Sequence, residues 1–330
     1  VEDGKKMIDA KAISVDLKYN ITEKLYIEIE VFAGGASAMA IISGGHTRFV
    51  HVSRCGEVVF SAEAAAADGA QPVAEVKDPE LTLRKVWDFA MTAPLDELQF
   101  ILEARKLNMN AAYESLKGEY GHAIGKLMRS ESERNIMGDT LHCQIVGMTT
   151  AACDARMAGA MIPVMSNSGS GNQGITVSMP VLAYAREYNI EEERIYRALV
   201  VSNLTAIHQK TLIGRLSAYC GAISAGCAAA CGVAYLLGED LETISKTLTN
   251  SLAVTSGIIC DGAKASCAAK IATAVESGLM GYYMCKNKKN FCDGDGIIGN
   301  GVEKTIKNIG TLASKGMRET DQVIIGIMTE

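Results

Sequence analysis

The sequence is poor in aromatic residues and in proline. Aromatic side chains make up 5% of its 330 residues, with a single tryptophan, and only five prolines occur. The chain contains instead 32 glycines and 15 methionines. Because proline interrupts helices and small side chains let helices approach closely, this composition favours a core of long, closely packed helices.

Positive charge is not in excess either. The chain has 32 lysines and arginines against 38 aspartates and glutamates, which gives a formal net charge of −6 at pH 7. No basic stripe is present, so we expect no nucleic-acid partner. The acidic excess favours solubility and says nothing about the fold.

We expect no signal peptide either, because residues 1–6 are mostly polar. The chain lacks an initiator methionine and opens like the middle of a helix, so we expect it to be part of a longer protein. We expect a cytoplasmic location, where ten cysteines stay reduced and serve as core residues, metal ligands or catalysts.

One stretch without charge, residues 216–238, is long enough to cross a bilayer. Glycine, alanine, serine and cysteine dominate it, so its transfer into lipid is only weakly favourable. A helix that is apolar all round is also typical of the buried centre of a large domain. We therefore expect a central helix and no membrane contact.

The first part of the chain has the pattern of a small antiparallel sheet. Residues 24–31 alternate between apolar and polar, as in a half-buried strand, and residues 38–42, 48–52 and 58–60 resemble further strands. Residues 55–57 predict a hairpin turn. From residue 79 onward the pattern is helical. We expect an α+β protein with a small N-terminal β element followed by a large, mostly helical domain.

Helix start signals and apolar periodicity define the helical part. The expected helices cover residues 82–90, 94–107, 109–117, 119–130, 137–160, 175–188, 192–212, 216–237, 241–257, 263–285 and 301–316, and residues 322–328 form a strand or a short helix. We divide the chain into residues 1–75, the remnant of an N-terminal α/β domain, and residues 76–330, the helical domain that binds cofactor and substrate.

A run of small polar residues and glycine precedes the helix expected at residue 175. Many backbone amides and hydroxyls at a helix start attract an anion such as a carboxylate or phosphate. The run has neither the lysine of a P-loop nor the spacing of a dinucleotide fingerprint. It forms either an anion site or a flexible loop with a helix cap. Its residues are Ser166, Asn167, Ser168, Gly169, Ser170, Gly171, Asn172, Gln173 and Gly174.

Seven of the ten cysteines fall between residues 220 and 292. Cys220, Cys227 and Cys231 form one stripe on the helix expected at 216–237. For Cys227 and Cys231 such a stripe is typical of core packing, whereas Cys220 lies near the helix start and is followed by Gly221. Cys260 and Cys267 would lie about 10.5 Å apart along one unbroken helix. The helix-breaking pair Asp261-Gly262 lets Cys260 end one helix while Cys267 begins the next, so that their sulfurs converge near a helix N-terminus that favours thiolates.

Three segments of the sequence carry a resemblance to a known family. They are residues 166–174, residues 215–221, and the run from Cys260 through Asp261 and Lys264 to Cys267. They resemble the L-cysteine desulfidase family, which is related to the α-domain of iron–sulfur L-serine dehydratases and includes many uncharacterised proteins. The segment His46-Thr47 and residues 303–310 fit as well, so the resemblance covers essentially the whole chain.

The resemblance implies a [4Fe–4S] cluster held by Cys220, Cys260 and Cys267, and no pyridoxal phosphate. Three ligands leave one iron open to act as a Lewis acid. The implied reaction is β-elimination from L-cysteine, giving hydrogen sulfide, pyruvate and ammonia. The cluster would be lost in aerobic preparations if it is oxygen-labile.

We expect a small amino-acid substrate, bound by residues 166–173 together with four further side chains. His46 and Thr47 are site residues or parts of a solvated loop. Lys210 and Arg215 pair with a carboxylate or with the charge of the cluster, or they are ordinary surface charges. The other histidines are expected to be structural or exposed: His51, His122, His142 and His208.

The chain departs from the family at one point. The proposed base of the family is a cysteine in a Gly-Cys-Thr-Glu-Pro motif, and this sequence has no such run. The catalytic base is therefore not assigned, and the chain is an active lyase only if that segment is supplied. L-serine is the alternative substrate, and a non-catalytic metabolite-binding or redox-sensing protein is the alternative class. Two possibilities for the assembly stay open: the chain forms a homo-oligomer, or it binds a separate N-terminal chain.

Overall fold

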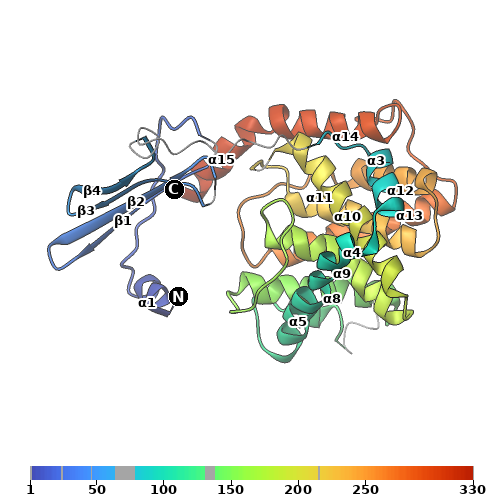
Figure 1. The fold of residues 1–330 in the computed structure, drawn as a ribbon, viewed down its shortest axis with the longest axis horizontal. Helices are drawn as coiled ribbons and strands as arrows, with labels where there is room; N and C mark the ends of the chain where they lie inside the picture. Colours follow the sequence, from blue (N-terminus) through green and yellow to red (C-terminus); the bar gives the residue numbers. More distant parts are fainter. Residues whose placement is uncertain are drawn as a thin grey trace. The chain divides into compact units, whose positions relative to one another are not determined.

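A computed structural model describes residues 2–23, 25–45, 47–63, 79–130, 138–214 and 216–329. The chain divides into two compact units, residues 1–79 with 326–330, and residues 80–325. The first holds the sheet and the second is helical, so the predicted α+β class with a small N-terminal antiparallel sheet is confirmed (Figure 1).

The sheet has four antiparallel strands that follow one another in chain order. A two-residue turn joins β3 to β4, and its residues Cys55 (φ 49°) and Gly56 (φ 81°) both have positive φ, as hairpin turns of this length require. This confirms the turn predicted there. The strands are β1 (Tyr26–Ala33), β2 (Ala36–Ser43), β3 (Phe49–Arg54) and β4 (Glu57–Ser61), and the short helix α1 (Glu2–Asp9) precedes them.

The helical unit contains most of the predicted helices, with shifted ends. Its elements are α3 (Leu83–Thr92), α4 (Leu95–Leu98), the 3-10 helix η1 (Gln99–Leu102), α5 (Glu103–Lys117), α6 (Ile124–Leu127), α8 (Leu141–Met157), α9 (Gly171–Glu187), α10 (Glu192–Ile213), α11 (Gly221–Leu236), α12 (Leu241–Thr255), α13 (Cys267–Lys286), α14 (Val302–Thr311), the π-helix η2 (Leu312–Gly316) and α15 (Arg318–Thr329). Residues 322–328 are thus helical.

Several boundaries differ from the sequence prediction. The helices expected at 94–107 and 109–117 are one continuous stretch of α4, η1 and α5. The helix expected at 119–130 shrinks to the single turn of α6, because Gly121 and Ala123 adopt positive φ ahead of it. The helix expected at 216–237 starts only at Gly221, because the residues before it pair with another segment.

Helix α11 forms the centre of the helical unit. It packs against α9, α10, α12 and α13, and almost all of its residues are buried. Cys227 and Cys231 are fully buried on it, as the core interpretation predicted. No helix within the described ranges is both long and apolar enough to cross a membrane.

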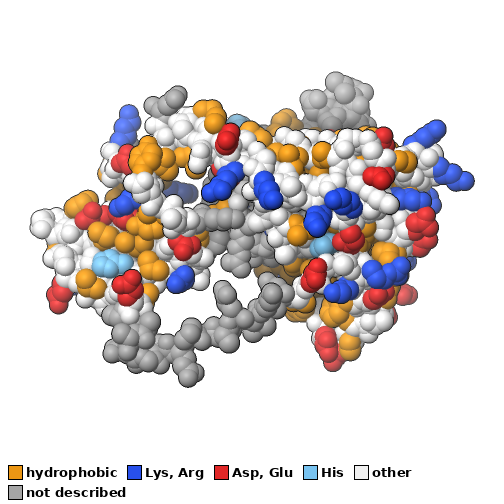
Figure 2. Space-filling view, turned by 90° about the horizontal axis from the view of Figure 1, so that it is seen from above, with side chains coloured by type: hydrophobic (Ala, Val, Ile, Leu, Met, Phe, Trp, Pro, Cys, Tyr) orange, Lys and Arg blue, Asp and Glu red, His pale blue; other side chains and the backbone are white. Residues whose placement is uncertain are grey.

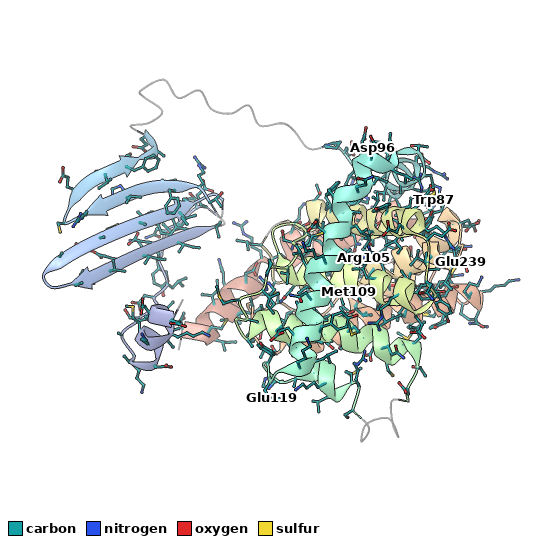
Figure 3. All side chains as sticks on the ribbon, turned by 60° about the horizontal axis from the view of Figure 1, so that its bottom comes forward. Trp87, Asp96, Arg105, Met109, Glu119 and Glu239 are labelled. Atoms are coloured by element: carbon teal, nitrogen blue, oxygen red, sulfur yellow. The ribbon has the colours of Figure 1, made fainter. Side chains whose placement is uncertain are left out.

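Capping and ion pairs position the outer helices around this centre. Thr82, Thr140 and Asp240 accept amide hydrogen bonds at the starts of α3, α8 and α12. Figure 3 shows α5 with Arg105 and Met109 along it, and Arg105 forms an ion pair of 2.9 Å with Glu192 at the start of α10. In the space-filling view, basic and acidic side chains are interspersed on the visible face (Figure 2).

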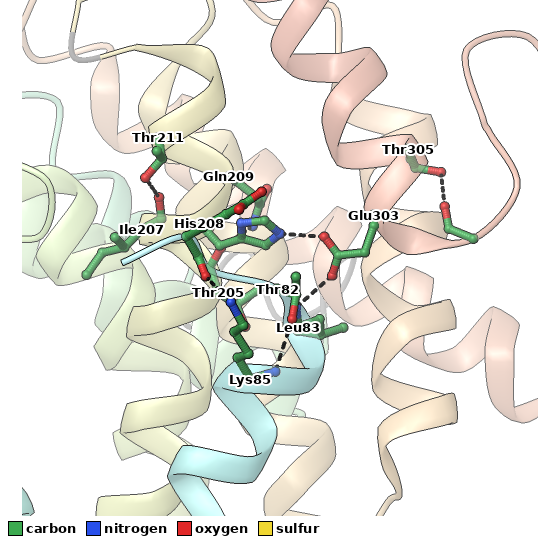
Figure 4. A network of polar contacts seen from close by, with 12 residues as sticks. Thr82, Leu83, Lys85, Thr205, Ile207, His208, Gln209, Thr211, Glu303 and Thr305 are labelled. Carbon is green, nitrogen blue, oxygen red and sulfur yellow. Dashed lines mark hydrogen bonds and ion pairs between the residues drawn. The ribbon is translucent and has the colours of Figure 1, made fainter. Parts of the chain in front are cut away.

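A buried histidine joins three helices. His208 of α10 lies 2.8 Å from Glu303 of α14, whose second carboxylate oxygen accepts the amide hydrogen of Leu83 at the start of α3 (Figure 4). Burial opposes ionisation of Glu303, but these two hydrogen bonds lower its pKa. His208 is therefore structural, as predicted.

Candidate functional site

The site is built where two distant segments form an isolated β-bridge. Tyr219 pairs antiparallel with Ile259. The amide of Cys220 donates to the carbonyl of Ile258 at 3.2 Å, and the amide of Cys260 donates to the carbonyl of Ala218 at 2.6 Å. Because side chains alternate along paired strands, Cys220 and Cys260 point to the same side of the bridge.

The two thiols are in hydrogen-bond contact, and their acidities diverge as a result. The hydrogen bond from Cys220 lowers the pKa of Cys260, against the effect of burial, and the amide of Gly262 with the charges of Lys270 and Lys210 lowers it further. The same contact and burial raise the pKa of Cys220. Within the pair, Cys260 is therefore the more acidic thiol and Cys220 the less acidic one.

Cys267 reaches the same neighbourhood through Gly262. The amide of Gly262 bonds to Cys260 Sγ, and its carbonyl oxygen lies 3.7 Å from Cys267 Sγ. Gly262 has φ +94°, a conformation that side-chain-bearing residues rarely adopt. The predicted break at Asp261-Gly262 is thus present. Cys260, however, lies in the bridge after α12 and does not end that helix, while Cys267 is the first residue of α13.

Helices α11 and α13 run parallel, so that both present their N-termini to these sulfurs. A Cβ on Gly226 would lie 2.7 Å from Ala274, and one on Gly278 would lie 3.0 Å from Ala230, so the contacts advance along both helices in the same direction. Small residues at these crossings let the backbones touch. Cys220 immediately precedes α11 and Cys267 starts α13. The positive helix ends favour negative charge at the sulfurs.

Helix α9 runs in the same direction beside α11. A Cβ on Gly221 would lie 2.5 Å from the Gln173 amide nitrogen, and one on Gly232 would lie 2.7 Å from Val181. The run of small polar residues therefore leads to the same end of the helical unit. Gln173 is 6% exposed, and its buried side-chain oxygen has no hydrogen-bond partner within the described structure.

The run itself is more ordered than a free loop. Asn167 and Ser170 exchange backbone hydrogen bonds of 3.1 and 3.0 Å around a two-residue turn at Ser168-Gly169. Ser170 Oγ caps α9 by accepting the amide hydrogen of Gln173 at 3.3 Å. Helix α9 starts at Gly171, earlier than the predicted residue 175, so fewer backbone amides stay free for an anion than the sequence suggested.

The side chains of this run divide into structural and free ones. Asn167 bonds to Asn203 of α10 at 3.0 Å, and Asn172 accepts a hydrogen bond from Arg156 at 3.0 Å. Gln173 is the one that is buried beside Cys220 without a partner for its oxygen among the described residues. Ser166 and Gly169 are exposed, and Ser168 and Ser170 are half-buried.

Lys210 is the predicted cation that the structure brings to the sulfurs. It is 6% exposed at the end of α10, and burial lowers its pKa while the nearby Cys260 and Cys220 raise it. Thr47 is exposed in the sheet unit, which is described separately from the helical unit. His46 and Arg215 lie outside the described residues.

Sequence reasoning missed two neighbours of the sulfurs. Lys270, one turn after Cys267, donates to the carbonyl of Ile259 at 3.1 Å and binds Asp261. Cys153 of α8 contacts Asn172 Oδ1 at 3.6 Å; burial, then the neighbouring Cys267, raises its pKa, so this thiol stays protonated. The i, i+3 spacing of Cys267 and Lys270 could have indicated the role of Lys270. No sequence pattern indicated that Cys153 lies near the site.

The donor set fits an iron–sulfur cluster better than a single metal ion. Among the described residues no three His, Cys, Asp or Glu side chains converge tightly enough for one ion. In a [4Fe–4S] cluster each cysteine binds a different iron, so its ligands lie farther apart than those of one ion. Two thiols in contact, a third across Gly262 and two nearby lysines satisfy the chemistry of an anionic thiolate cluster.

Comparison with known proteins agrees with this architecture. Residues 30–326 match the family model described as serine dehydratase alpha chain. The description of this family supports a lyase-type function in general. The protein belongs to the serine dehydratase alpha chain family, and this confirms the family-level resemblance.

Its relatives include many proteins named only as UPF0597. One from Bacteroides fragilis is 49% identical over the whole of this chain and 76% of its own length. Another from Phocaeicola vulgatus is 48% identical with the same coverage. A third, from Oleidesulfovibrio alaskensis, is 40% identical over 99% of this chain and 76% of its own length.

Proposed function

We propose that this chain holds a [4Fe–4S] cluster through Cys220, Cys260 and Cys267 and acts in the β-elimination of hydrogen sulfide from L-cysteine, with pyruvate and ammonia as the final products. The observation that carries the proposal is the contact between the Cys220 and Cys260 thiols, with Cys267 on the other side of Gly262. These residues are 40 and 7 positions apart in the sequence, and only the fold brings them together.

A bound cluster would supply a Lewis acid, because three cysteine ligands leave one iron open to the substrate carboxylate and the leaving group. The chain's own contribution is positive charge and orientation. Lys210 provides a buried ammonium group beside Cys220 and Cys260, and it would attract the substrate carboxylate. The unpartnered oxygen of Gln173 would accept a hydrogen bond from the substrate ammonium group.

The residue that removes the α-proton is not assigned. The sequence has no Gly-Cys-Thr-Glu-Pro run. Burial raises the pKa values of the thiols of Cys153, Cys227 and Cys231, so these thiols stay protonated and cannot accept the proton. A supplied segment, from a partner chain or a longer form of the protein, would provide the base. We place the protein in the cytoplasm, where a reduced cluster is stable.

L-serine is the alternative substrate, since the elimination differs only in its leaving group. The family description favours serine, whereas the resemblance of the cysteine segments favours L-cysteine. A metabolite-binding or redox-sensing role without turnover is the alternative from another class. Such a role would need the cluster and the substrate contacts but no base.

The test is an anaerobic assay of the iron-reconstituted chain, combined with the segment that supplies the base, with L-cysteine and with L-serine as substrates, measuring sulfide, pyruvate and ammonia. The proposal predicts sulfide and pyruvate in equal amounts from L-cysteine. It also predicts loss of this activity in Cys220→Ala, Cys260→Ala and Cys267→Ala but not in Cys231→Ala, whose thiol is buried in α11.

Three other outcomes decide against it. Faster pyruvate release from L-serine would establish the dehydratase alternative. A spectral response of the cluster to either amino acid, without product, would establish the binding or sensing role. Equal turnover in all four cysteine variants would contradict the assignment of Cys220, Cys260 and Cys267 as the cluster ligands.

A further inference from the structure

The segment between the second and third cysteines is held by an ion-pair arrangement. Asp261 follows Cys260 directly, and its carboxylate contacts two lysines, Lys264 at 2.6 Å and Lys270 at a shorter distance. Lys270 Nζ also donates to the carbonyl of Ile259 at 3.1 Å. Lys270 therefore contacts the residues on both sides of Cys260.

The two lysines differ in what they join. Lys264 lies in the same connector as Asp261, and its Nζ bonds to the backbone carbonyl and the carboxylate of that residue. Lys270 belongs to α13, one turn after Cys267, and its side chain is only 22% exposed. Of these two lysine side chains, that of Lys270 links the connector that carries Cys260 to the helix that carries Cys267.

This link spans a sharp turn of the backbone. Gly262 allows the sharp turn between the two cysteines, and no side chain at that position restrains it. The bridge at Tyr219 and Ile259 fixes Cys260 relative to Cys220 but not relative to α13. A second restraint is needed to fix the third sulfur against the other two.

We propose that Lys270 and Asp261 are positioning residues that set the separation of the Cys260 and Cys267 sulfurs for cluster binding. The inference rests on the proposed function in one respect: it takes the cluster to be the group that the three sulfurs bind. Residues that orient metal ligands typically change metal affinity about 10–100-fold when they are replaced.

The test uses the cluster-free chain and dibromobimane, a reagent that fluoresces when it bridges two thiols. Mass spectrometry of the peptides gives the ratio of Cys260–Cys267 links to Cys220–Cys260 links. The Cys220–Cys260 link is the internal reference, because the backbone bridge at Tyr219 and Ile259 holds these two cysteines together. We expect Lys270→Met and Asp261→Asn to lower this ratio several-fold. Lys264→Met is the matched control and should leave it unchanged, and Lys270→Arg should restore it.

The iron-loaded protein gives the second readout. Iron retention against a chelator should fall about 10–100-fold in Lys270→Met and Asp261→Asn, with helical content unchanged by circular dichroism. An unchanged link ratio in Lys270→Met, or an equal fall in Lys264→Met, would overturn the positioning role. Failure of the wild-type chain to bind iron would instead overturn the proposed function, while the link ratio would still decide the role of Lys270.

Discussion

Asp154 is a carboxylate in the core of the helical unit, with its side chain fully buried. One oxygen accepts the amide hydrogen of Gly125 at 2.8 Å, and the other has no hydrogen-bond partner among the described residues. Burial raises the pKa of Asp154 from 3.8 to about 6, and the Gly125 amide and His122 only partly offset it. Asp154 thus anchors α6 to α8, and burial makes the ionisation of its carboxyl group unfavourable.

This unfavourable ionisation makes the stability of the protein depend on pH. Between pH 3.8 and about 6 the folded state keeps a proton that the unfolded chain has lost, so this contribution to the free energy of unfolding decreases as pH rises through the window and stays low above it. Asp154→Asn should remove this dependence and be more stable than the wild type at pH 8 by on the order of 1–3 kcal/mol.

Urea denaturation at pH 5 and pH 8 measures the difference. Asp88→Asn, on the exposed face of α3, is the control and should follow the wild type. Identical changes with pH in Asp154→Asn and the wild type would show that Asp154 is ionised in the folded protein without penalty.

At the scale of elements, the parallel packing of α11 and α13 positions the cysteines. Gly226 and Gly278 let the two helices approach so closely that a Cβ on Gly226 would lie 2.7 Å from the backbone of Ala274. Larger residues would force the helices apart and would move Cys220 away from Cys267. The glycines therefore support the site, although Gly226 lies about two turns and Gly278 about three turns beyond the cysteines.

Gly226→Ala should lower the free energy of unfolding by about 1–3 kcal/mol, because overpacking of a core contact costs that much. It should also reduce iron binding, since the two helix starts carry two of the three ligands. Gly257→Ala is the control, because a Cβ there meets no atom within 4 Å. Denaturation midpoints measure the effect, and equal midpoints in the two variants would contradict the close packing.

Local signals in the sequence were sufficient for the strands, most helices and the break at Asp261-Gly262. They were not sufficient for the bridge between Tyr219 and Ile259, because pairing across 40 residues leaves no periodic pattern. The small polar run was predicted to be all loop, since glycine and serine are poor helix formers. The structure starts α9 inside that run, because the Ser170 cap and burial outweigh propensity.

The candidate ligands were predicted from family resemblance, not from spacing. The six residues between Cys260 and Cys267 are compatible with many arrangements, and the positive φ of Gly262 sets the turn found in the structure. Lys270 was missed because its role depends on a contact with the carbonyl of Ile259, 11 positions earlier, which no pattern encodes.

At the scale of the whole molecule, the sulfur site lies within residues 80–325, and the sheet belongs to the other unit. Three helices of the larger unit direct their N-termini to one end, where Cys220, Cys260, Cys267, Lys210 and Gln173 are gathered. The central claim is that this end of the helical unit is a cluster site.

Iron and acid-labile sulfide analysis of the anaerobically reconstituted chain tests that claim most directly. The account predicts about four iron and four sulfide ions per chain, and a loss of most of both in Cys260→Ala but not in Cys231→Ala. Iron-free protein after reconstitution, or equal iron in the two variants, would contradict it.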